Sequence, residues 1–120
     1  MGLDAYIYVK GVSHPYNIVD NSIDNTRKNG IEIWYGRKEY VLHEWMHQLF
    51  ISKGGDPSLQ FNCESYVLLD KLDMDNLIQD LTSSFFKEVE KELIFDYKEL
   101  AYKIKTLNEK GNTVYYTSWW

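Results

Sequence analysis

Cysteine, proline and long hydrophobic runs are scarce in this chain, and each scarcity excludes a class of protein. Cys63 is the single cysteine among 120 residues, so no internal disulfide can form and a reducing compartment is favoured. No hydrophobic run approaches the roughly 18 residues that a membrane-spanning helix needs. The opening residues, MGLD, lack the basic and apolar segments of a secretory signal. We therefore expect neither a disulfide scaffold nor a membrane or secreted protein.

The chain also has no excess of basic residues over acidic ones. Lysine and arginine number 13 against 18 aspartates and glutamates, which gives a net charge of −5. The acidic surplus lies between residues 56 and 80, in Asp56, Glu64, Asp70, Asp73, Asp75 and Asp80. Nucleic-acid binding without sequence preference relies on clustered basic side chains, so we expect no nucleic-acid partner. The acidic stretch is interpreted as a solvated face, with an acidic protein–protein inhibitor as the alternative.

The composition is otherwise that of one soluble domain spanning residues 1–120. Hydrophobic residues make up 44% and charged residues 26% of the chain, which is typical of globular proteins and not of disordered ones. Aromatic residues stand out at 16%, with ten tyrosines and four tryptophans. Exposed aromatics would suit a partner surface or a homodimer, so both remain open.

Hydrophobic periodicity predicts an α+β fold with the order β-β-α-β-α-α-β. Alternating or aromatic segments predict strands at 3–10, 31–35, 63–69 and 113–119. Three- and four-residue steps predict helices at 39–53, from the N-cap Asp73 to Leu81, and along an apolar seam from Phe86 to Leu107. Turn-forming residues predict a long loop at 11–30. We expect a single mixed or antiparallel four-stranded sheet with about three helices packed on it.

The segment His43-Glu44-Trp45-Met46-His47 matches the H-E-x-x-H pattern of zinc hydrolases. On a helix, residues four apart share a face, so the two imidazoles can hold one zinc ion. Glu44 is then placed to act as the base that activates a bound water. This pattern supports the alternative hypothesis of a zinc-dependent hydrolase.

A catalytic zinc site needs a third protein ligand, and the sequence supplies no clear one. No histidine follows within twelve residues of His47. Glu64 is the first candidate and Cys63 a further one, both on the predicted third strand. The histidines also lie beside the apolar stripe of the predicted helix, where such side chains commonly serve packing. We therefore favour a protein without a metal or other cofactor.

Several short motifs resemble a family of small bacteriophage proteins found in T4-like phages, including those of marine cyanobacteria. The motifs are the MGLD start with Tyr6 and Tyr8, then Y-G-R-K at 35–38, H-E-W-M at 43–46, N-C-E-S-Y at 62–66 and V-Y-Y-T-S-W at 114–119. One departure is that only Phe85-Phe86 remains of a glycine-flanked aromatic hairpin common in that family. The resemblance implies a phage product that acts in the host bacterial cytoplasm as an accessory or host-takeover protein.

The motif residues divide by chemistry. Large aromatics such as Trp45, Tyr66 and Trp119 are explained as well by filling a core, whereas polar residues at the ends of elements suggest a site. Arg37, Lys38 and His43 together predict a corner that attracts a phosphate or carboxylate. Ion pairing of Arg37 with Glu39, or with an acidic residue between 56 and 80, is the structural alternative. The predicted binding residues are Tyr35, Arg37, Lys38, His43, Trp45, Asn62, Cys63, Ser118 and Trp119.

No complete catalytic set is visible, so the leading hypothesis is a non-catalytic binder. Its ligand would be a small anionic molecule or a host protein. The alternatives are the zinc hydrolase, through His43, His47 and Glu64, and the acidic inhibitor.

Overall fold

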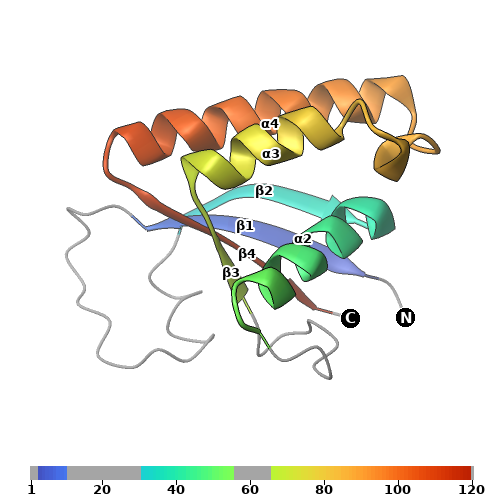
Figure 1. The fold of residues 1–120 in the computed structure, drawn as a ribbon. Helices are drawn as coiled ribbons and strands as arrows, with labels where there is room; N and C mark the ends of the chain where they lie inside the picture. Colours follow the sequence, from blue (N-terminus) through green and yellow to red (C-terminus); the bar gives the residue numbers. More distant parts are fainter. Residues whose placement is uncertain (1–2, 11–30, 56–65, 120) are drawn as a thin grey trace.

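The computed structural model describes residues 3–10, 31–55 and 66–119, which form one antiparallel sheet with three α-helices on it (Figure 1). The strands are β1 (Asp4–Lys10), β2 (Ile31–Arg37), β3 (Tyr66–Leu69) and β4 (Thr113–Trp119). The helices are α2 (Tyr40–Ser52), α3 (Lys71–Asp80) and α4 (Lys91–Glu109). The predicted α+β class and element order are confirmed, and all strand pairs are antiparallel.

The sheet has the strand order β2-β1-β4-β3, so the first and last strands lie at its centre. Asp4 of β1 is opposite both Arg37 of β2 and Trp119 of β4. Figure 1 accordingly shows the two chain ends at the same end of the sheet. This pairing brings residues from both ends of the sequence side by side.

One face of the sheet packs against the helices, and we call it the helix face. Strand alternation places Ala5, Ile7 and Val9 on this face, and all three are buried. Tyr116 of β4 lies opposite Ile7, and Val67 of β3 lies opposite Tyr116. The opposite face carries the other residues of each strand, beginning with Tyr6 and Tyr8. We call it the tyrosine face.

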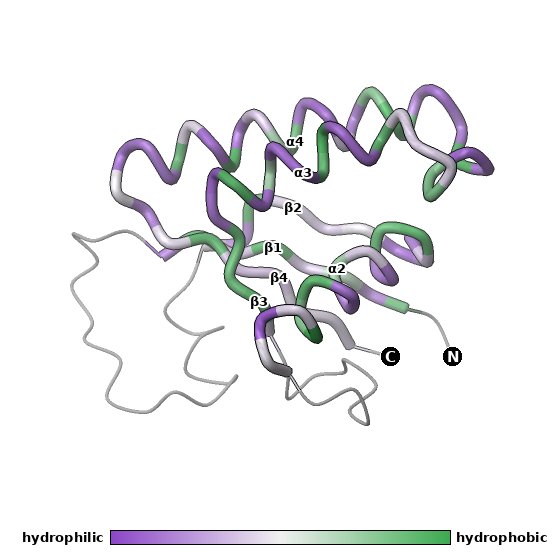
Figure 2. The backbone as a smooth tube through the Cα atoms, viewed as in Figure 1, coloured by the Kyte–Doolittle hydropathy of each residue, from purple (hydrophilic) through white to green (hydrophobic). Residues whose placement is uncertain are grey.

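The helices complete the core with one apolar side each. These sides supply Leu42 and Met46 from α2, Met74 and Leu77 from α3, and Leu100, Ala101 and Ile104 from α4. In Figure 2 hydrophobic and hydrophilic stretches alternate along α3 and α4, as expected of helices with one buried side. Among the described helices, none is both long and apolar enough to cross a membrane.

The start of α3 differs from the prediction. The N-cap is Asp70 and not Asp73, and the helix begins at Lys71. Asp73 occupies the third helical position, where its carboxylate accepts the Asp70 backbone N–H at 3.0 Å while its own N–H donates to Asp70 Oδ1 at 2.8 Å. Two aspartates three residues apart therefore form a reciprocal capping box. The sequence analysis predicted Asp73 as the N-cap, whereas the N-cap is Asp70 and Asp73 is its partner in the capping box.

The apolar seam predicted from Phe86 to Leu107 is not one helix. Phe86 is buried in a short 3₁₀ turn, Ser84–Phe86, and α4 begins only at Lys91. The hydroxyl of Ser83 accepts the Phe85 backbone N–H and so caps that turn. The seam nevertheless covers one continuous core, because Phe86 packs against Tyr97 with ring centroids 6.2 Å apart. The predicted loop at 11–30 and residues 63–65 lie outside the described residues.

Candidate functional site

A continuous row of tyrosine rings crosses the tyrosine face. From β2 to β3 it runs through Tyr35, Tyr6, Tyr8, Tyr115 and Tyr66. Successive ring centroids lie 5.3, 6.0, 5.6 and 5.9 Å apart, which is the range of stabilising aromatic contacts. All four strands contribute at least one ring. Two of these contacts join directly paired residues, Tyr6 with Tyr35 and Tyr8 with Tyr115, so the tyrosine row depends on the strand register.

Exposure along this face is uneven. Tyr115 is only 1% exposed and Thr117 is fully buried, whereas Tyr35 is 48% and Trp119 53% exposed. Leu68, on the edge strand β3, is also exposed. The accessible aromatic surface therefore lies toward the margins of the face and not at its centre.

Three of the predicted binding residues meet at one corner of this face. Arg37 and Trp119 are both strand partners of Asp4, so their side chains share its side of the sheet. Tyr35 joins them, because its hydroxyl donates to Asp4 Oδ1 at 2.6 Å. We call Tyr35, Arg37 and Trp119 the sheet corner. The structure thus brings together residues that are 84 positions apart in sequence, from 35 to 119.

Only some of the charged groups at the sheet corner have partners within the protein. The hydrogen bond to Asp4 raises the pKa of the Tyr35 hydroxyl, and the nearby Arg37 opposes that rise to a smaller extent. The Asp4 carboxylate is therefore engaged by Tyr35. The exposed side chains of Arg37 and Lys38 form no hydrogen bond or ion pair with other described residues. Two cations are consequently available at the end of β2.

Lys38 directs the chain from β2 into α2. Its φ of 60° is in the left-handed region, which an L-residue other than glycine rarely adopts. Its backbone N–H donates to the carbonyl oxygen of Leu3 at 2.7 Å. The turn follows Arg37 directly in the chain, and the side chain of Lys38 is exposed there.

His43 lies on the other side of the sheet, which corrects the expectation that it shares a corner with Arg37 and Lys38. Its Nδ1 is 2.9 Å from the hydroxyl of Tyr116, a residue of the helix face, and its side chain is buried. Burial lowers the pKa of His43 to about 4, with the neighbouring His47 adding to the effect. Burial also raises the pKa of the Tyr116 hydroxyl. At neutral pH both groups are uncharged and form a structural polar pair.

The side chain of Glu39 also has its partner on the helix side of the sheet. Its Oε2 accepts a hydrogen bond from the Tyr97 hydroxyl of α4 at 2.8 Å. Burial raises the pKa of Tyr97, and this hydrogen bond contributes to the rise. The ion pair of Arg37 with Glu39 that the sequence suggested is not formed. This leaves the guanidinium of Arg37 outward on the tyrosine face.

Two further residues of the predicted site lie on the helix side of the sheet. Trp45 is buried, and its indole Nε1–H donates to Asp80 Oδ2 at 2.9 Å. Ser118 is fully buried and lies opposite Ala5 on the helix face. Asn62 and Cys63 lie outside the described residues. The predicted residues are therefore divided. Tyr35, Arg37 and Trp119 lie at the exposed margin of the tyrosine face, Lys38 is exposed in the turn after β2, and the other described members lie on the helix side.

The H-E-x-x-H segment lies on α2, as predicted. His47 Nδ1 is 3.9 Å from Glu44 Oε2. Within residues 3–10, 31–55 and 66–119, no group of three His, Cys, Asp or Glu side chains is arranged to hold a metal ion. Glu64, the first candidate for a third ligand, is outside these ranges. The zinc hypothesis therefore remains a prediction.

The acidic stretch has internal roles wherever the structure describes it. Asp73 pairs with Lys53, and Asp75 pairs with Lys105, each at 2.5 Å. Asp80 accepts from Trp45, and Asp70 caps α3. Because these carboxylates serve partners within the chain, they do not form one uncommitted acidic surface. The acidic-inhibitor alternative remains a prediction.

Sequence reasoning missed the tyrosine row. The alternating Tyr6 and Tyr8 and the tyrosines in the other predicted strands were a visible signal. Their assembly into one row depends on the strand order, which hydrophobic period alone does not fix. Comparison of the chain with protein families, curated proteins and solved structures finds no match.

Proposed function

We propose that this protein is a non-catalytic binding protein that docks another protein through the sheet corner, Tyr35, Arg37 and Trp119. The motif resemblance supplies the proposed setting, a bacteriophage accessory protein that acts on a host protein in the bacterial cytoplasm. The observation that carries the proposal is the convergence of these three side chains on one accessible corner.

The residue types of the sheet corner support a protein partner. Tryptophan, tyrosine and arginine are the residues most enriched among those that dominate binding energy at protein interfaces. Tyr35 and Trp119 are each about half exposed, and the guanidinium of Arg37 is exposed beside them. The two aromatic side chains present a large contact area with few rotatable bonds, which lowers the entropy lost on binding.

The charge of the sheet corner narrows the chemistry of the partner. Arg37 and Lys38 form no ion pair with other described residues, and the carboxylate of Asp4, the strand partner of Arg37, accepts from Tyr35. An acidic side chain of the partner, flanked by apolar ones, would complement two cations beside two aromatic rings. Because the cations are exposed, their contribution should weaken as salt increases.

A small anionic ligand is supported less well than a protein. The predicted anion site needed His43 beside the two cations, and His43 is buried on the helix face. A guanidinium and an ammonium on an exposed rim can still attract an anion, but nothing among the described residues encloses it there. Binding of a nucleotide in place of a protein is therefore an outcome that the experiment must distinguish.

The test is affinity capture from a host bacterial lysate with tagged wild-type protein and three variants. Trp119→Ala and Arg37→Ala remove sheet-corner side chains, and Phe95→Ala is the control, because Phe95 is 61% exposed on α4. We expect the affinity for the captured protein to fall at least about tenfold in both corner variants. The control should retain wild-type affinity.

Equal capture by all four proteins would overturn the proposal, as would a Phe95→Ala loss as large as that of Trp119→Ala. A thermal shift with nucleotides that depends on Arg37, together with no protein capture, would favour the small-ligand alternative. These results are separable because the first measurement detects proteins and the second detects small molecules.

The zinc-hydrolase alternative retains one supporting observation. His43 is kept neutral, and its Nδ1 is held by a hydrogen bond, as is common for imidazoles that bind zinc. Metal analysis of the purified protein decides the matter. Stoichiometric zinc that is lost in His47→Ala would replace the binding proposal by a hydrolytic one, whereas metal-free protein would remove this alternative.

A further inference from the structure

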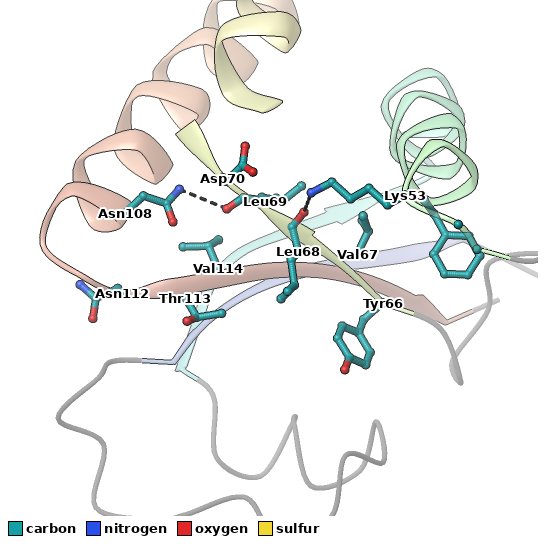
Figure 3. A pocket seen from close by; sticks show the side chains of 13 residues that line it. Lys53, Tyr66, Val67, Leu68, Leu69, Asp70, Asn108, Asn112, Thr113 and Val114 are labelled. Carbon is teal, nitrogen blue, oxygen red and sulfur yellow. Dashed lines mark hydrogen bonds between the residues drawn. The ribbon is translucent and has the colours of Figure 1, made fainter. Parts of the chain in front are cut away.

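A second candidate site lies at the edge of the sheet that β3 forms. In the strand order β2-β1-β4-β3, β4 is the only strand beside β3 among the described residues. A cavity of about 690 Å³ is lined by β3, the end of α2 and the turn from α4 to β4 (Figure 3). None of Tyr35, Arg37 and Trp119 lines it. Whatever binds here is therefore independent of the docking proposed for the sheet corner.

The lining of the cavity shows that it follows the edge of β3 and not one face of the sheet. Val67 and Leu69 belong to the helix face, and both line the cavity. Tyr66 and Leu68 belong to the tyrosine face, and both line it as well. A space that touches both faces of one strand passes around the free edge of that strand. An extended peptide fits such a space, because its side chains alternate between two faces.

A side chain occupies one backbone acceptor at this edge. The Leu68 carbonyl oxygen accepts from the ammonium of Lys53 at 2.5 Å, and the Leu69 carbonyl oxygen accepts from Asn108 at 3.1 Å. Successive residues of a strand direct their carbonyls to opposite sides, and Figure 3 shows Lys53 and Asn108 on opposite sides of β3. Asn108 is in the last turn of α4, which leads directly into β4. Lys53 is therefore on the other side of β3, at its open edge.

Lysine is a common device for protecting the edge of a sheet from pairing with another chain. The ammonium of Lys53 is also held by Asp73 Oδ2, to which it donates at 2.5 Å. Because an ammonium has three donors on a flexible stem, it can release the Leu68 carbonyl and keep its ion pair with Asp73. One exchangeable hydrogen bond therefore protects this acceptor.

The charges around the edge favour a basic segment. Asp70 lines the cavity and is exposed, and it forms no ion pair with other described residues. The carboxylate of Asp73 balances the ammonium of Lys53, so Asp70 leaves one negative charge in excess. Val67 and Leu69 add buried apolar surface on the helix side of the lining. A segment with apolar residues on one side and a lysine or arginine near its end complements this edge.

We propose that the open edge of β3 binds an extended basic segment of a partner protein, which joins the sheet as a fifth strand. A backbone N–H of the segment replaces Lys53 at the Leu68 carbonyl. Apolar side chains of the segment lie against Val67 and Leu69, and its cation lies at Asp70. The four residues of β3 span about 13 Å, so about four to five residues of the partner pair with it. Backbone pairing gives the affinity, and the alternating side chains give the selectivity.

The test is an NMR titration of the full chain with the peptide acetyl-Thr-Val-Thr-Val-Lys-amide and with a counterpart in which glutamate replaces lysine. We expect the lysine peptide to shift the amide signals of β3 and of residues 53–55, with a dissociation constant below about 1 mM. The glutamate peptide should bind at least about threefold more weakly, because its carboxylate meets that of Asp70. Equal affinities, or unchanged β3 signals, would overturn the proposal.

Methylation of the peptide backbone distinguishes strand addition from simple insertion into the cavity. Two further lysine peptides carry N-methyl groups at alternate residues, one at the odd positions and the other at the even positions. Because a strand pairs with its neighbour through every second residue, one of them should lose at least about tenfold in affinity while the other retains it. Equal loss in both peptides, or full retention in both, would contradict strand addition.

Two variants of equal charge locate the cation of the peptide. Asp70→Asn removes the carboxylate charge but keeps an oxygen that can cap α3, and it should weaken the lysine peptide about two- to fivefold. Asp75→Asn removes one negative charge from α3 outside the cavity and should leave the affinity unchanged. Equal effects of the two variants would overturn the proposal. Self-association of the chain that the peptide does not reverse would also overturn it, because a second copy would then occupy the edge.

Discussion

The two faces of the sheet use the same residue type, tyrosine, in opposite ways. On the helix face Tyr116 is fully buried, and its hydroxyl forms a hydrogen bond with His43 inside the core. On the tyrosine face Tyr35 is half exposed, and its hydroxyl binds Asp4 at the surface. The helix face is therefore closed by α2, α3 and α4, while the other presents rings at its margins.

This difference teaches that aromatic content alone does not separate core from site. A tyrosine has an apolar ring and a polar tip, so it is compatible with a packed interior and with a wet interface. A core tyrosine and a surface tyrosine differ in the residues that surround each ring. Tyr116 lies among buried aliphatic side chains, whereas Tyr35 lies beside the uncommitted guanidinium of Arg37.

The largest expected difference between the faces is in core truncation. Ile7→Ala removes a fully buried side chain of the helix face and should lower the free energy of unfolding by about 2 to 5 kcal/mol. Tyr35→Ala on the tyrosine face should cost about 1 kcal/mol or less, because the ring is half exposed. Chemical denaturation of both variants measures the contrast, and similar losses would contradict the division of the faces.

The pH dependence of stability tests the closed state of the helix face. Burial lowers the pKa of His43 from 6.5 to about 4. Below pH 6.5 the unfolded chain binds a proton that the folded chain does not bind until about pH 4. The contribution of His43 to stability is therefore fully present above pH 6.5 and lost as the pH falls toward 4, by roughly 2 to 3 kcal/mol.

The glutamine variant isolates this titration from that of the carboxylates. His43→Gln keeps a group able to bond the Tyr116 hydroxyl but takes up no proton. The difference in unfolding free energy between wild type and variant should shrink from pH 7 to pH 4.5. A difference that stays constant over this range would show that the imidazole is not buried as the structure places it.

The smallest contrast comes from deleting one hydroxyl on each face. Tyr116→Phe removes the partner of His43 Nδ1 within the core and should cost about 1 to 2 kcal/mol. Tyr35→Phe removes the exposed bond to Asp4 and should cost no more than about 0.5 kcal/mol. Thermal unfolding of the two variants gives the comparison, which would fail if Tyr35→Phe were the more damaging.

Much of the fold was predictable because its elements carry strong periodic patterns. The strand at 113–119 matched its predicted limits, and α2 differed by one residue at each end. The errors fell where two residues competed for one role, as with Asp70 and Asp73 at the start of α3. They also fell where one apolar seam continued across a break in the backbone, from Phe86 into α4.

The candidate site was predictable only in part, because its assembly depends on tertiary pairing. The motifs indicated Tyr35, Arg37 and Trp119 as site residues, and the sheet brings these three together. The same motifs indicated His43, whose helix position could be predicted but whose side of the sheet could not.

The most direct test of the docking proposal compares two indole groups in one NMR experiment. Trp119 is exposed at the sheet corner, while the Trp45 indole N–H is bonded to Asp80 on the helix side. When the captured partner protein is added, we expect the Trp119 indole signal to shift and the Trp45 signal to stay in place. A shift of Trp45 with an unchanged Trp119 would contradict it.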